Sequence, residues 1–562
     1  MSQQAYKTVT EQQDEPFYWL NENSREFLRE GYLLAGVEPE ERIRQIAERA
    51  EEILDEDGFA DKFYEYMGRG YYSLASPVWA NFGLDRGLPI SCFGSHMEDS
   101  MESILYTQAE VGEMTKLGGG TSGYFGELRP RGSPITNNGK SNGSYSFTQL
   151  FDTIINVVSQ GETRRGQFAG YIDVEHDDLE EWLNIKTEGD PVQDIYYGVI
   201  IGDEWFQAMI DGDAEKRETW AKIIETRINI GVPYIVFRDN MNEGKPQVYK
   251  DNGYEINASN LCTEIALPAT PDESFVCCLS SMNALHFDEW KETDAVETLT
   301  RFLDAVMEEF IQKADGVQFM ERPVRFAKRH RAIGIGVLGW HSYLQKNMIP
   351  FDSMEAMQKN EQVFRTIKEH SYEASAELAE EFGEPAVVEG YGRRNATTMA
   401  VAPTKSSSVI LGQVSPSVEP LKSNYFVRDG AKLKATQKNR FLEALLAERG
   451  TDTREVWDSI AAKDGSVQHL DCLTDEEKEV FKTFSEIPQM AIINQAAQRQ
   501  KHIDQAQSIN VSIDPSEVSV KQINQLYISA WKKGIKSLYY QHSVNAAQKF
   551  SQDLLECKAC ES

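Results

Sequence analysis

Long apolar runs and cysteines are both scarce in this sequence. No stretch approaches the roughly 18 consecutive apolar residues of a membrane-spanning helix, and no apolar segment follows Met1 as it would in a secretory leader. The chain holds 7 cysteines in 562 residues, an odd number that is typical of a reducing compartment, where thiols are catalytic, redox-active or part of a core. We therefore expect a cytoplasmic protein that neither enters nor crosses a membrane.

Basic residues are also few, with 57 Lys and Arg against 89 Asp and Glu, which gives a formal net charge of −32. A protein of this charge repels polyanions, so we do not expect its main function to be binding to a nucleic-acid polymer or an anionic membrane. Any phosphate ligand has to be held by local groups.

The order of elements along the chain indicates the fold class. Apolar residues at helical spacing between 40 and 55 predict a helical N-terminal region. From about Ser76 onward, short β-rich runs alternate with amphipathic helices, which is typical of α/β architecture. The expected strands include 196–201, 228–237, 399–402 and 508–513, and the expected helices include 203–227, 288–314, 354–382 and 517–532.

An amide, a thiol and a carboxylate alternate at Asn260, Cys262 and Glu264. If this stretch is extended, the three side chains share one face and can act on two neighbouring hydroxyls at once. The carboxylate can accept a proton, the amide can form hydrogen bonds, and the thiol can do redox or nucleophilic chemistry. The alternative is a half-buried strand that exposes its polar face to solvent.

Three further groups of cysteines are Cys92, the adjacent Cys277 and Cys278, and Cys557 with Cys560. A buried structural role is the usual explanation of a single cysteine. That explanation fails for the Cys-x-x-Cys close to the end of the chain, which is either a dithiol redox couple or half of a zinc site. Because the sequence holds no second Cys-x-x-Cys, we expect no metal site in this chain.

Tyr539 and Tyr540 are adjacent aromatic residues, and such a pair ordinarily packs in a core. Two stacked phenols can instead pass a one-electron oxidation to a thiol. That second function requires an oxidant from outside the chain.

Several stretches are typical either of flexible loops or of phosphate-binding loops. Residues 116–123, 127–134 and 159–166 combine glycine or other small residues with basic side chains, and 403–408 is rich in hydroxyls after an apolar run. Two or three phosphate-binding loops in an acidic protein indicate nucleotide ligands.

Together, these residues resemble the large, catalytic (alpha) subunit of class I ribonucleotide reductases from about Ser76 onward. The most specific matches are Asn260-Leu-Cys-Thr-Glu264, Cys277 ahead of Asn283, Tyr539-Tyr540 and the terminal dithiol, in the order of the family. The resemblance implies a ten-stranded α/β barrel of two five-stranded parallel halves around a thiol-bearing central loop. It divides the chain into an N-terminal helical region (1–75), the barrel with its effector loops (76–540) and a flexible redox tail (541–562).

The resemblance also implies a role for each residue of the reaction. Cys262 becomes a thiyl radical that abstracts the 3′ hydrogen of a ribonucleotide, Glu264 takes the proton of the 3′ hydroxyl, and Asn260 bonds the sugar hydroxyls. Cys92 and Cys277 protonate the departing 2′ hydroxyl and supply two electrons, which leaves them as a disulfide.

Electrons and the radical come from outside the barrel in this family. Cys557 and Cys560 would reduce the disulfide and then be reduced by a thioredoxin or glutaredoxin type partner. Tyr539 and Tyr540 would carry the oxidising equivalent from a radical-generating small (beta) subunit, which holds the metal cofactor.

The resemblance further implies two nucleotide sites. The substrate-binding positions are Ser76, Ser91, Thr404, Lys405, Ser406 and Ser407, with the last two at the diphosphate. A nucleoside triphosphate effector that selects the substrate is expected near Asp99 and Arg129, with Gln160 and Arg164 on the loop that transmits the choice. Effector control of this kind implies an alpha homodimer.

Two positions depart from the family pattern. Thr136 stands where some members carry an arginine, which affects how effector phosphates are bound. The doubled Cys277-Cys278 leaves the redox cysteine ambiguous by one position, because only one of two adjacent residues in an extended segment faces the site. We choose Cys277 for its spacing to Asn283.

Larger members carry an N-terminal ATP-binding cone through which dATP stops the enzyme. Only 91 residues precede Cys92 and they resemble the helical region, so we expect no cone in this compact form. Such a form suits a viral enzyme, which would act in host cytoplasm.

Two alternatives are a class II reductase, which uses adenosylcobalamin, and a catalytically inactive nucleotide-binding regulator. The tyrosine pair argues against the first and the complete thiol set against the second.

Overall fold

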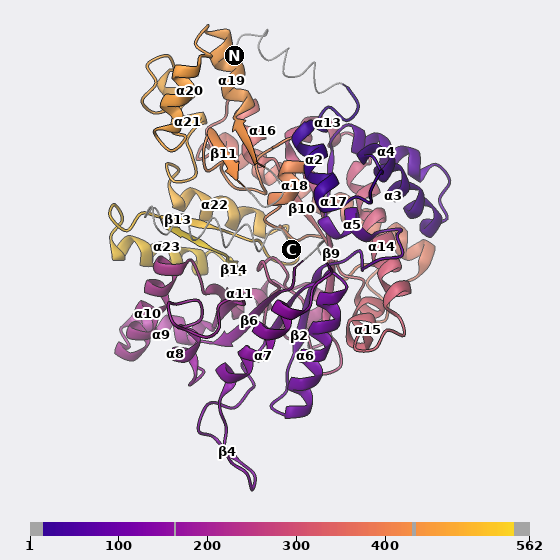
Figure 1. The fold of residues 1–562 in the computed structure, drawn as a ribbon, viewed down its shortest axis with the longest axis vertical. Coiled ribbons are helices and arrows are strands. Elements are labelled where there is room, and N and C mark those ends of the chain that lie inside the picture. Colours follow the sequence, from indigo (N-terminus) through magenta and orange to yellow (C-terminus); the bar gives the residue numbers. More distant parts are fainter. Residues whose placement is uncertain (1–14, 162–164, 430–433, 544–562) are drawn as a thin grey trace.

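The computed structural model describes residues 15–161, 165–429 and 434–543 (Figure 1). Helices α2 (Glu22–Gly31), α3 (Pro39–Leu54) and α4 (Phe59–Gly68) lie together on one side of the molecule, where α3 and α4 pack against the long helix α14 (Ala295–Ala314). The helix expected between 40 and 55 is therefore present as α3. Its apolar stripe, which includes Ile43 and Ile46, is buried in this contact.

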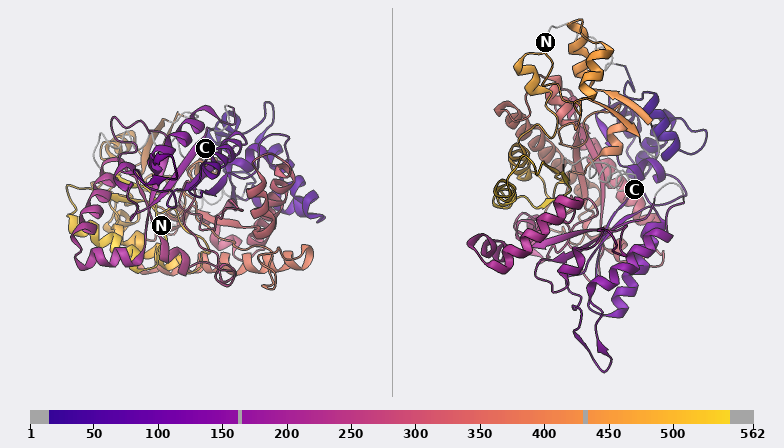
Figure 2. Two further views of the ribbon diagram at one scale, coloured as in Figure 1. Left: turned by 90° about the horizontal axis from the view of Figure 1, so that it is seen from below. Right: turned by 60° about the vertical axis from the view of Figure 1, so that its left-hand side comes forward.

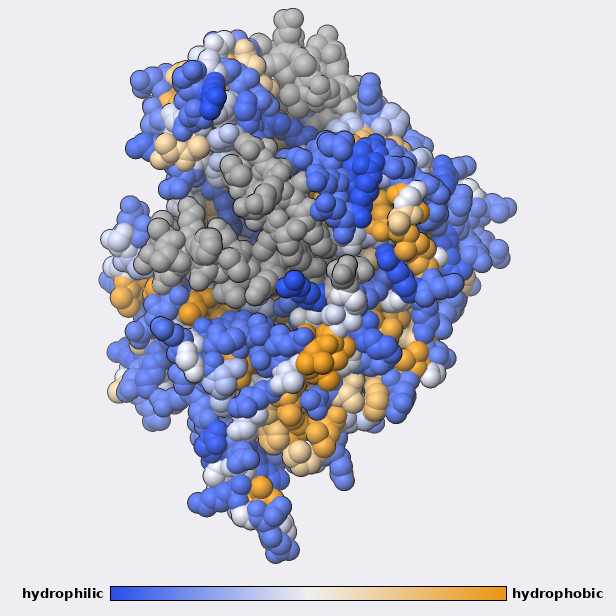
Figure 3. Space-filling view, in the orientation of Figure 1, coloured by the Kyte–Doolittle hydropathy of each residue, from blue (hydrophilic) through white to orange (hydrophobic). Residues whose placement is uncertain are grey.

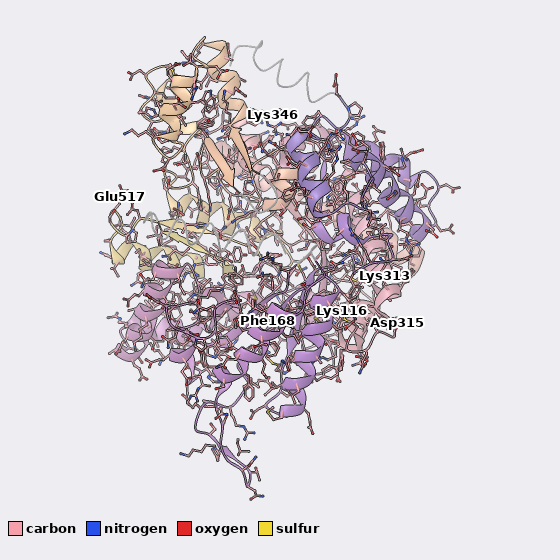
Figure 4. The ribbon with its side chains drawn as sticks, viewed as in Figure 1. Lys116, Phe168, Lys313, Asp315, Lys346 and Glu517 are labelled. Carbon is pink, nitrogen blue, oxygen red and sulfur yellow. The ribbon has the colours of Figure 1, made fainter. Side chains whose placement is uncertain are left out.

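Five parallel strands form the first half of the barrel. In hydrogen-bonded order they are β2 (Cys92–His96), β3 (Gly120–Tyr124), β6 (Gln167–Asp173), β7 (Tyr196–Ile201) and β8 (Tyr234–Phe237). The connecting helices include α6 (Met101–Lys116), α7 (Ser144–Val157), α8 (Leu179–Trp182), α9 (Asp203–Asp211) and α10 (Ala214–Ile230). Phe168 of β6 is labelled in Figure 4. Its ring stacks on that of Phe151 of α7 with centroids 4.6 Å apart, which fixes this helix on the sheet.

The second half begins at β9 (Phe275–Asn283), which is antiparallel to β2 and to β1 (Tyr72–Leu74) and parallel to β10 (Ile333–Leu338). Two isolated parallel β-bridges, from Ile335 to Met399 and from Val401 to Gln507, continue this second half of the barrel. The α/β barrel is confirmed, but in the described residues its largest sheet has nine strands. Segment 399–402 and the start of 508–513 do not form the regular strands expected of them.

The barrel closes through the strand that directly precedes the tyrosine pair. β14 (Ser537–Leu538) pairs antiparallel with β8, and Tyr539 N–H donates to Ile509 O at 2.7 Å. The short strands β13 (Val511–Ile513) and β15 (Gln541–Ser543) then pair in parallel. Residues 505–511 and 537–541 therefore join the two halves.

Glycines make the boundaries of two elements differ from those predicted, the helix over 203–227 and the strand over 228–237. Gly212 (φ +117°) ends α9 in the left-handed conformation and Asp213 then caps α10, so the single helix expected over 203–227 is two helices. Gly231 (φ +83°) likewise ends α10 at Ile230, so β8 starts only at Tyr234 and the strand expected over 228–237 is shorter. Helix 354–382 is present as α17 (Met354–Phe382), and 517–532 as α23 (Val520–Lys532).

The other helices around the barrel are α5 (Ser76–Asn81), α11 (Arg238–Glu243), α12 (Gln247–Asp251), η2 (Ala284–His286), α13 (Phe287–Trp290), α15 (Glu321–His330), α16 (Trp340–Lys346), α18 (Lys405–Ile410) and α22 (Gln489–Gln500). The segment expected as one helix over 288–314 is divided between α13 and α14.

Two units project from the barrel at opposite ends of its long axis (Figure 2). One is the hairpin of β4 (Pro134–Ile135) and β5 (Gly139–Lys140). The other comprises β11 (Tyr425–Asp429), β12 (Lys434–Lys438), α19 (Arg440–Glu448), α20 (Arg454–Ala461) and α21 (Asp475–Val480).

The surface in Figure 3 is mostly hydrophilic, in keeping with the acidic composition. Exposed apolar side chains on the neighbouring helices α6 and α7 include Met101, Leu105 and Val157. Among the described residues, no helix combines the length and apolar character that crossing a membrane requires.

Candidate active site

The segment around Cys262 forms a turn rather than the expected strand. Thr263 adopts a left-handed conformation with φ +69°, and its N–H donates to Asn260 O at 3.4 Å. Asn260 Oδ1 accepts from the Ile265 N–H at 3.2 Å, so this side chain closes the turn. The prediction of an extended face is wrong because a local side-chain to backbone bond replaces strand pairing here.

Cys262 lies half-buried at the tip of this turn, between two segments that close the barrel. The Tyr539 hydroxyl is 3.5 Å from Cys262 Sγ. Ser508 Oγ donates to the Cys262 carbonyl, and Ser537 Oγ donates to the Thr263 carbonyl at 2.8 Å. These contacts fix the thiol directly beside a phenol.

Glu264 is almost fully buried, with 1% of its surface exposed. Burial raises the pKa of its carboxyl to about 7, although hydrogen bonds from Asn260 and from Ser508 act in the opposite direction. The Ser508 hydroxyl lies 3.2 Å from Glu264 Oε2. A carboxyl of this pKa can gain or lose a proton near neutrality, as a general base requires.

Cys92 and Cys277 face each other across the junction of the two barrel halves. They are directly paired in the antiparallel register of β2 and β9, and both are free thiols. Asn260 Nδ2 lies 3.7 Å from Cys92 Sγ, and Gln505 Nε2 lies 3.4 Å from Cys277 Sγ. Burial raises the pKa of each thiol well above its ordinary value. The turn, the two thiols and the carboxyl of Glu264 therefore share one site.

Cys278 points away from this site. Its thiol donates to the carbonyl of Leu303 on α14, at 3.2 Å, on the opposite face of β9. Adjacent strand residues alternate between faces, so only one of the doubled cysteines can face Cys92. The geometry favours Cys277, and its role stays a prediction.

Four tyrosines form a cluster beside Cys262. The rings of Tyr539 and Tyr540 are 4.2 Å apart between centroids and tilted by 51°. The ring centroid of Tyr234 lies 4.9 Å from that of Tyr539, and the hydroxyls of Tyr234 and Tyr540 are 3.1 Å apart. The ring of Tyr196 stacks on that of Tyr234 with centroids 6.3 Å apart. We did not predict Tyr196 and Tyr234. Both lie on expected strands, but a single sequence does not tell which strands become neighbours.

The predicted substrate-binding residues lie at the beginnings of three elements. They are Thr404, Lys405, Ser406 and Ser407 at α18, Ser76 at the start of α5, and Ser91 directly before β2. Thr404, with φ +48°, is the residue before α18, and its hydroxyl accepts from the Ser417 N–H at 2.7 Å. α18 packs against β1, and α5, which begins at Ser76, follows β1 in the chain.

The predicted effector residues fall into two places. Arg129 Nε and Asp99 Oδ2 form an exposed ion pair at 2.6 Å, and Asp99 also accepts from the Arg129 N–H at 3.1 Å. Gln160 Nε2 donates to Asn81 Oδ1 at 2.9 Å, which joins its loop to the last residue of α5. Arg164 lies outside the described residues, as do Cys557 and Cys560.

Ser508 and Gln505 were not predicted as site residues. Nothing in a single sequence indicates that Ser508 contacts the Cys262 turn or that Gln505 contacts Cys277. Within the described ranges, one group with metal-ligand geometry is Glu297, His370 and Glu373, on α14 and α17. It includes none of the thiol-site residues.

Family models match most of the chain. The model described as the ribonucleotide reductase barrel domain matches residues 90–216, 210–387 and 385–541. The model described as the ribonucleotide reductase all-alpha domain matches residues 18–87, which include α2 to α4.

Relatives agree with this assignment. The "Putative ribonucleoside-diphosphate reductase large subunit" of Frog virus 3 is 37% identical, over 89% of this chain and 92% of its own length. The ribonucleoside-diphosphate reductase large subunit of Caenorhabditis elegans is 30% identical, over 90% of this chain and 75% of its own. The solved class Id ribonucleotide reductase alpha subunit of Actinobacillus ureae is 59% identical, with a TM-score of 0.90 over 97% of this chain and 99% of that one.

Proposed function

This chain belongs to the ribonucleotide reductase large-subunit family, and from that membership we propose that it reduces ribonucleoside diphosphates to 2′-deoxyribonucleotides by thiyl-radical chemistry. The observation that carries the proposal is the contact of Tyr539 Oη with Cys262 Sγ at 3.5 Å, beside a paired set of thiols. A phenol at this distance can take the hydrogen atom of the thiol when an oxidising equivalent reaches it.

The radical step begins at Cys262. Once its hydrogen atom has passed to Tyr539, the thiyl radical abstracts the 3′ hydrogen of the ribose. Glu264, whose pKa of about 7 makes it a base near neutrality, accepts the proton of the 3′ hydroxyl. Asn260, whose carbonyl oxygen is fixed by the turn, holds the sugar hydroxyls with its amide group.

The reduction step belongs to the paired thiols. One of them protonates the departing 2′ hydroxyl, which leaves as water, and Cys92 and Cys277 together supply two electrons and become a disulfide. Cys262 then returns the hydrogen atom to the 3′ carbon and is itself re-formed as a radical. Their register on β2 and β9 supports this pairing, because directly opposed residues of antiparallel strands are close enough to be bridged.

The substrate and effector are nucleotides in this proposal. The diphosphate binds at the first turn of α18, where Ser406 and Ser407 supply hydroxyls and backbone N–H groups. A nucleoside triphosphate binds near Asp99 and Arg129 and acts through the loop of Gln160. A radical-generating beta subunit holds the metal cofactor and supplies the oxidising equivalent.

Further partners follow from the same proposal. Cys557 and Cys560 reduce the Cys92–Cys277 disulfide and are reduced by a thioredoxin or glutaredoxin type protein in the cytoplasm. A second copy of the chain covers the apolar side chains of α6 and α7 to form an alpha homodimer.

A class II mechanism is the nearest alternative. It would make the thiyl radical with adenosylcobalamin and would leave the four clustered tyrosines without a use. The test is reduction of cytidine diphosphate by the purified chain, a dithiol reductant and a class I beta subunit. Product should form only when the beta subunit is present. Product formation with adenosylcobalamin in place of that subunit would contradict the proposal.

A further inference from the structure

The two sulfurs of the paired thiols differ in their access to other molecules. Cys92 is half-buried, whereas Cys277 has 1% of its surface exposed. β10 runs so close to Cys277 that a Cβ on Gly334 would lie 3.3 Å from its sulfur. A thiolate must approach a disulfide sulfur directly, so packing around Cys277 blocks attack there and leaves Cys92 as the accessible sulfur.

Gln505 holds a hydrogen-bond donor at the enclosed sulfur. Its Nε2 lies 3.4 Å from Cys277 Sγ and 2.9 Å from Thr397 Oγ1. Its Oε1 accepts from the Ala266 N–H at 3.2 Å, and its own carbonyl accepts from Lys536 Nζ at 2.7 Å. Gln505 is completely buried, so this amide is fixed in place before any charge develops on Cys277.

The charged and polar groups near the two sulfurs affect the pKa of Cys92 and the pKa of Cys277 differently. After burial, the Glu264 carboxylate is the largest cause that raises the pKa of Cys92, although the Asn260 amide opposes it. For Cys277 the Glu264 carboxylate is the smallest of the causes, behind burial and Cys278, while the hydrogen bond from Gln505 lowers the pKa. The ionised Glu264 carboxylate therefore disfavours a thiolate on Cys92, and the Gln505 amide favours a thiolate on Cys277.

We propose that the Cys92–Cys277 disulfide opens in one direction: an incoming thiolate attacks Cys92 Sγ, and Cys277 leaves as a thiolate held by Gln505. The inference rests on the proposed function, which makes this pair the redox disulfide.

The step conserves atoms and electrons. The attacking sulfur of a dithiol bonds to Cys92 Sγ, the bond between Cys92 and Cys277 breaks with both electrons on Cys277, and that thiolate then takes a proton. The second thiol of the dithiol attacks the first, which releases Cys92 and leaves the dithiol oxidised by two electrons. Gln505 is a positioning residue that stabilises the leaving sulfur.

The direction can be read from which cysteine keeps the incoming thiol. The full-length chain is oxidised with diamide, exposed briefly to reduced glutathione, quenched in acid, and mapped by mass spectrometry after alkylation of free thiols. We expect glutathione on Cys92 and an alkylated Cys277. Glutathione on Cys277, or on both equally, would overturn the inference and leave the proposed function intact. Failure of diamide to link Cys92 to Cys277 would refute the redox pair itself.

A matched pair of variants tests the part played by Gln505. Gln505→Met removes the donor at nearly constant volume, and we expect cleavage by glutathione to slow about ten-fold, the size of one hydrogen bond to a charged group. The ratio of Cys92 to Cys277 adducts should fall as well, which a general loss of packing would not cause. Gln507→Met is the control, because Gln507 is equally buried and bonds to Arg499 and Ala496 instead of to a thiol. An unchanged rate and ratio in Gln505→Met would overturn this role.

Discussion

The hydroxyl of Tyr539 lies 3.5 Å from the sulfur of Cys262, although 277 positions separate the two residues in the sequence. Tyr539 follows the strand that closes the barrel, and Cys262 lies at the tip of the central turn. The segment that closes the barrel therefore also places the phenol of Tyr539, through which an oxidant can reach the thiol. This arrangement explains why the tyrosine pair and the cysteine turn occur together in one chain.

Tyr539→Phe should abolish nucleotide reduction, because the ring would still fill its place but could no longer exchange a hydrogen atom with Cys262. The measurement is deoxynucleotide formation with the beta subunit and a dithiol reductant. Tyr197→Phe is the matched control, since Tyr197 is also fully buried and its hydroxyl has no hydrogen-bond partner among the described residues. Turnover by Tyr539→Phe at a rate near that of the control would contradict the radical path.

The pH dependence of turnover should follow Glu264. Its carboxyl pKa is about 7, so the carboxylate needed as a base is lost as pH falls below this value. We expect kcat to decline about ten-fold per pH unit below pH 7. Glu264→Gln should remove nearly all activity and abolish this limb of the profile. A wild-type profile that stays flat down to pH 5 would show that Glu264 is not the base.

The same carboxyl should make the folded protein less stable at high pH. Between pH 4.5 and about 7 the folded chain binds the Glu264 proton more tightly than the unfolded chain, so stability falls as pH rises through this window. Above it, the buried charge costs on the order of 3 kcal/mol. Glu264→Gln should therefore melt at a higher temperature than wild type at pH 8, with a smaller difference at pH 5.

Exposed Glu188→Gln is the control for that thermal measurement, and it should leave the difference between pH 5 and pH 8 unchanged. A lower melting temperature of Glu264→Gln at pH 8 would mean that the carboxylate is stabilised by its surroundings.

Substrate choice should depend on the bond between Gln160 and Asn81. This bond connects the predicted effector loop to α5, which begins at the predicted substrate residue Ser76. In Gln160→Ala, we expect the effector-induced change in relative kcat/KM among the four ribonucleotides to shrink by about five-fold or more. Competition assays with and without effector measure it. An undiminished effector response would show that coupling takes another route.

The doubled cysteine gives a direct comparison of two neighbours. Cys277→Ser should stop steady-state turnover because no disulfide can form with Cys92. Cys278→Ser should keep turnover, since the Cys278 thiol lies on the α14 side of β9, where it donates to the Leu303 carbonyl. The steady-state turnover of both variants is measured with saturating dithiol reductant. Loss of turnover in Cys278→Ser with retained turnover in Cys277→Ser would reverse our choice.

The alternation of strand-like and helical runs was sufficient to predict α/β architecture, and short motifs were sufficient to identify the family. The resemblance to that family then implied the barrel and a candidate set of thiols and tyrosines. The sequence could not give the conformation around Cys262. Alternating polar residues suggested a strand, but the bond of Asn260 Oδ1 to the Ile265 N–H makes a turn. Residues that act through long-range contacts were also missed. Gln505 touches Cys277 across 228 positions, and Tyr234 touches Tyr540 across 306. No local pattern encodes such pairings.

Cys262→Ser tests the mechanism most directly. The variant is assayed with the beta subunit and dithiol reductant, and binding of a nucleoside triphosphate is measured by calorimetry. Cys472→Ser, which changes a half-buried thiol that is not part of the site, is the control. We predict that Cys262→Ser forms no deoxynucleotide while binding the effector as tightly as wild type. Deoxynucleotide formation by Cys262→Ser at the rate of the control would contradict a thiyl radical at this position.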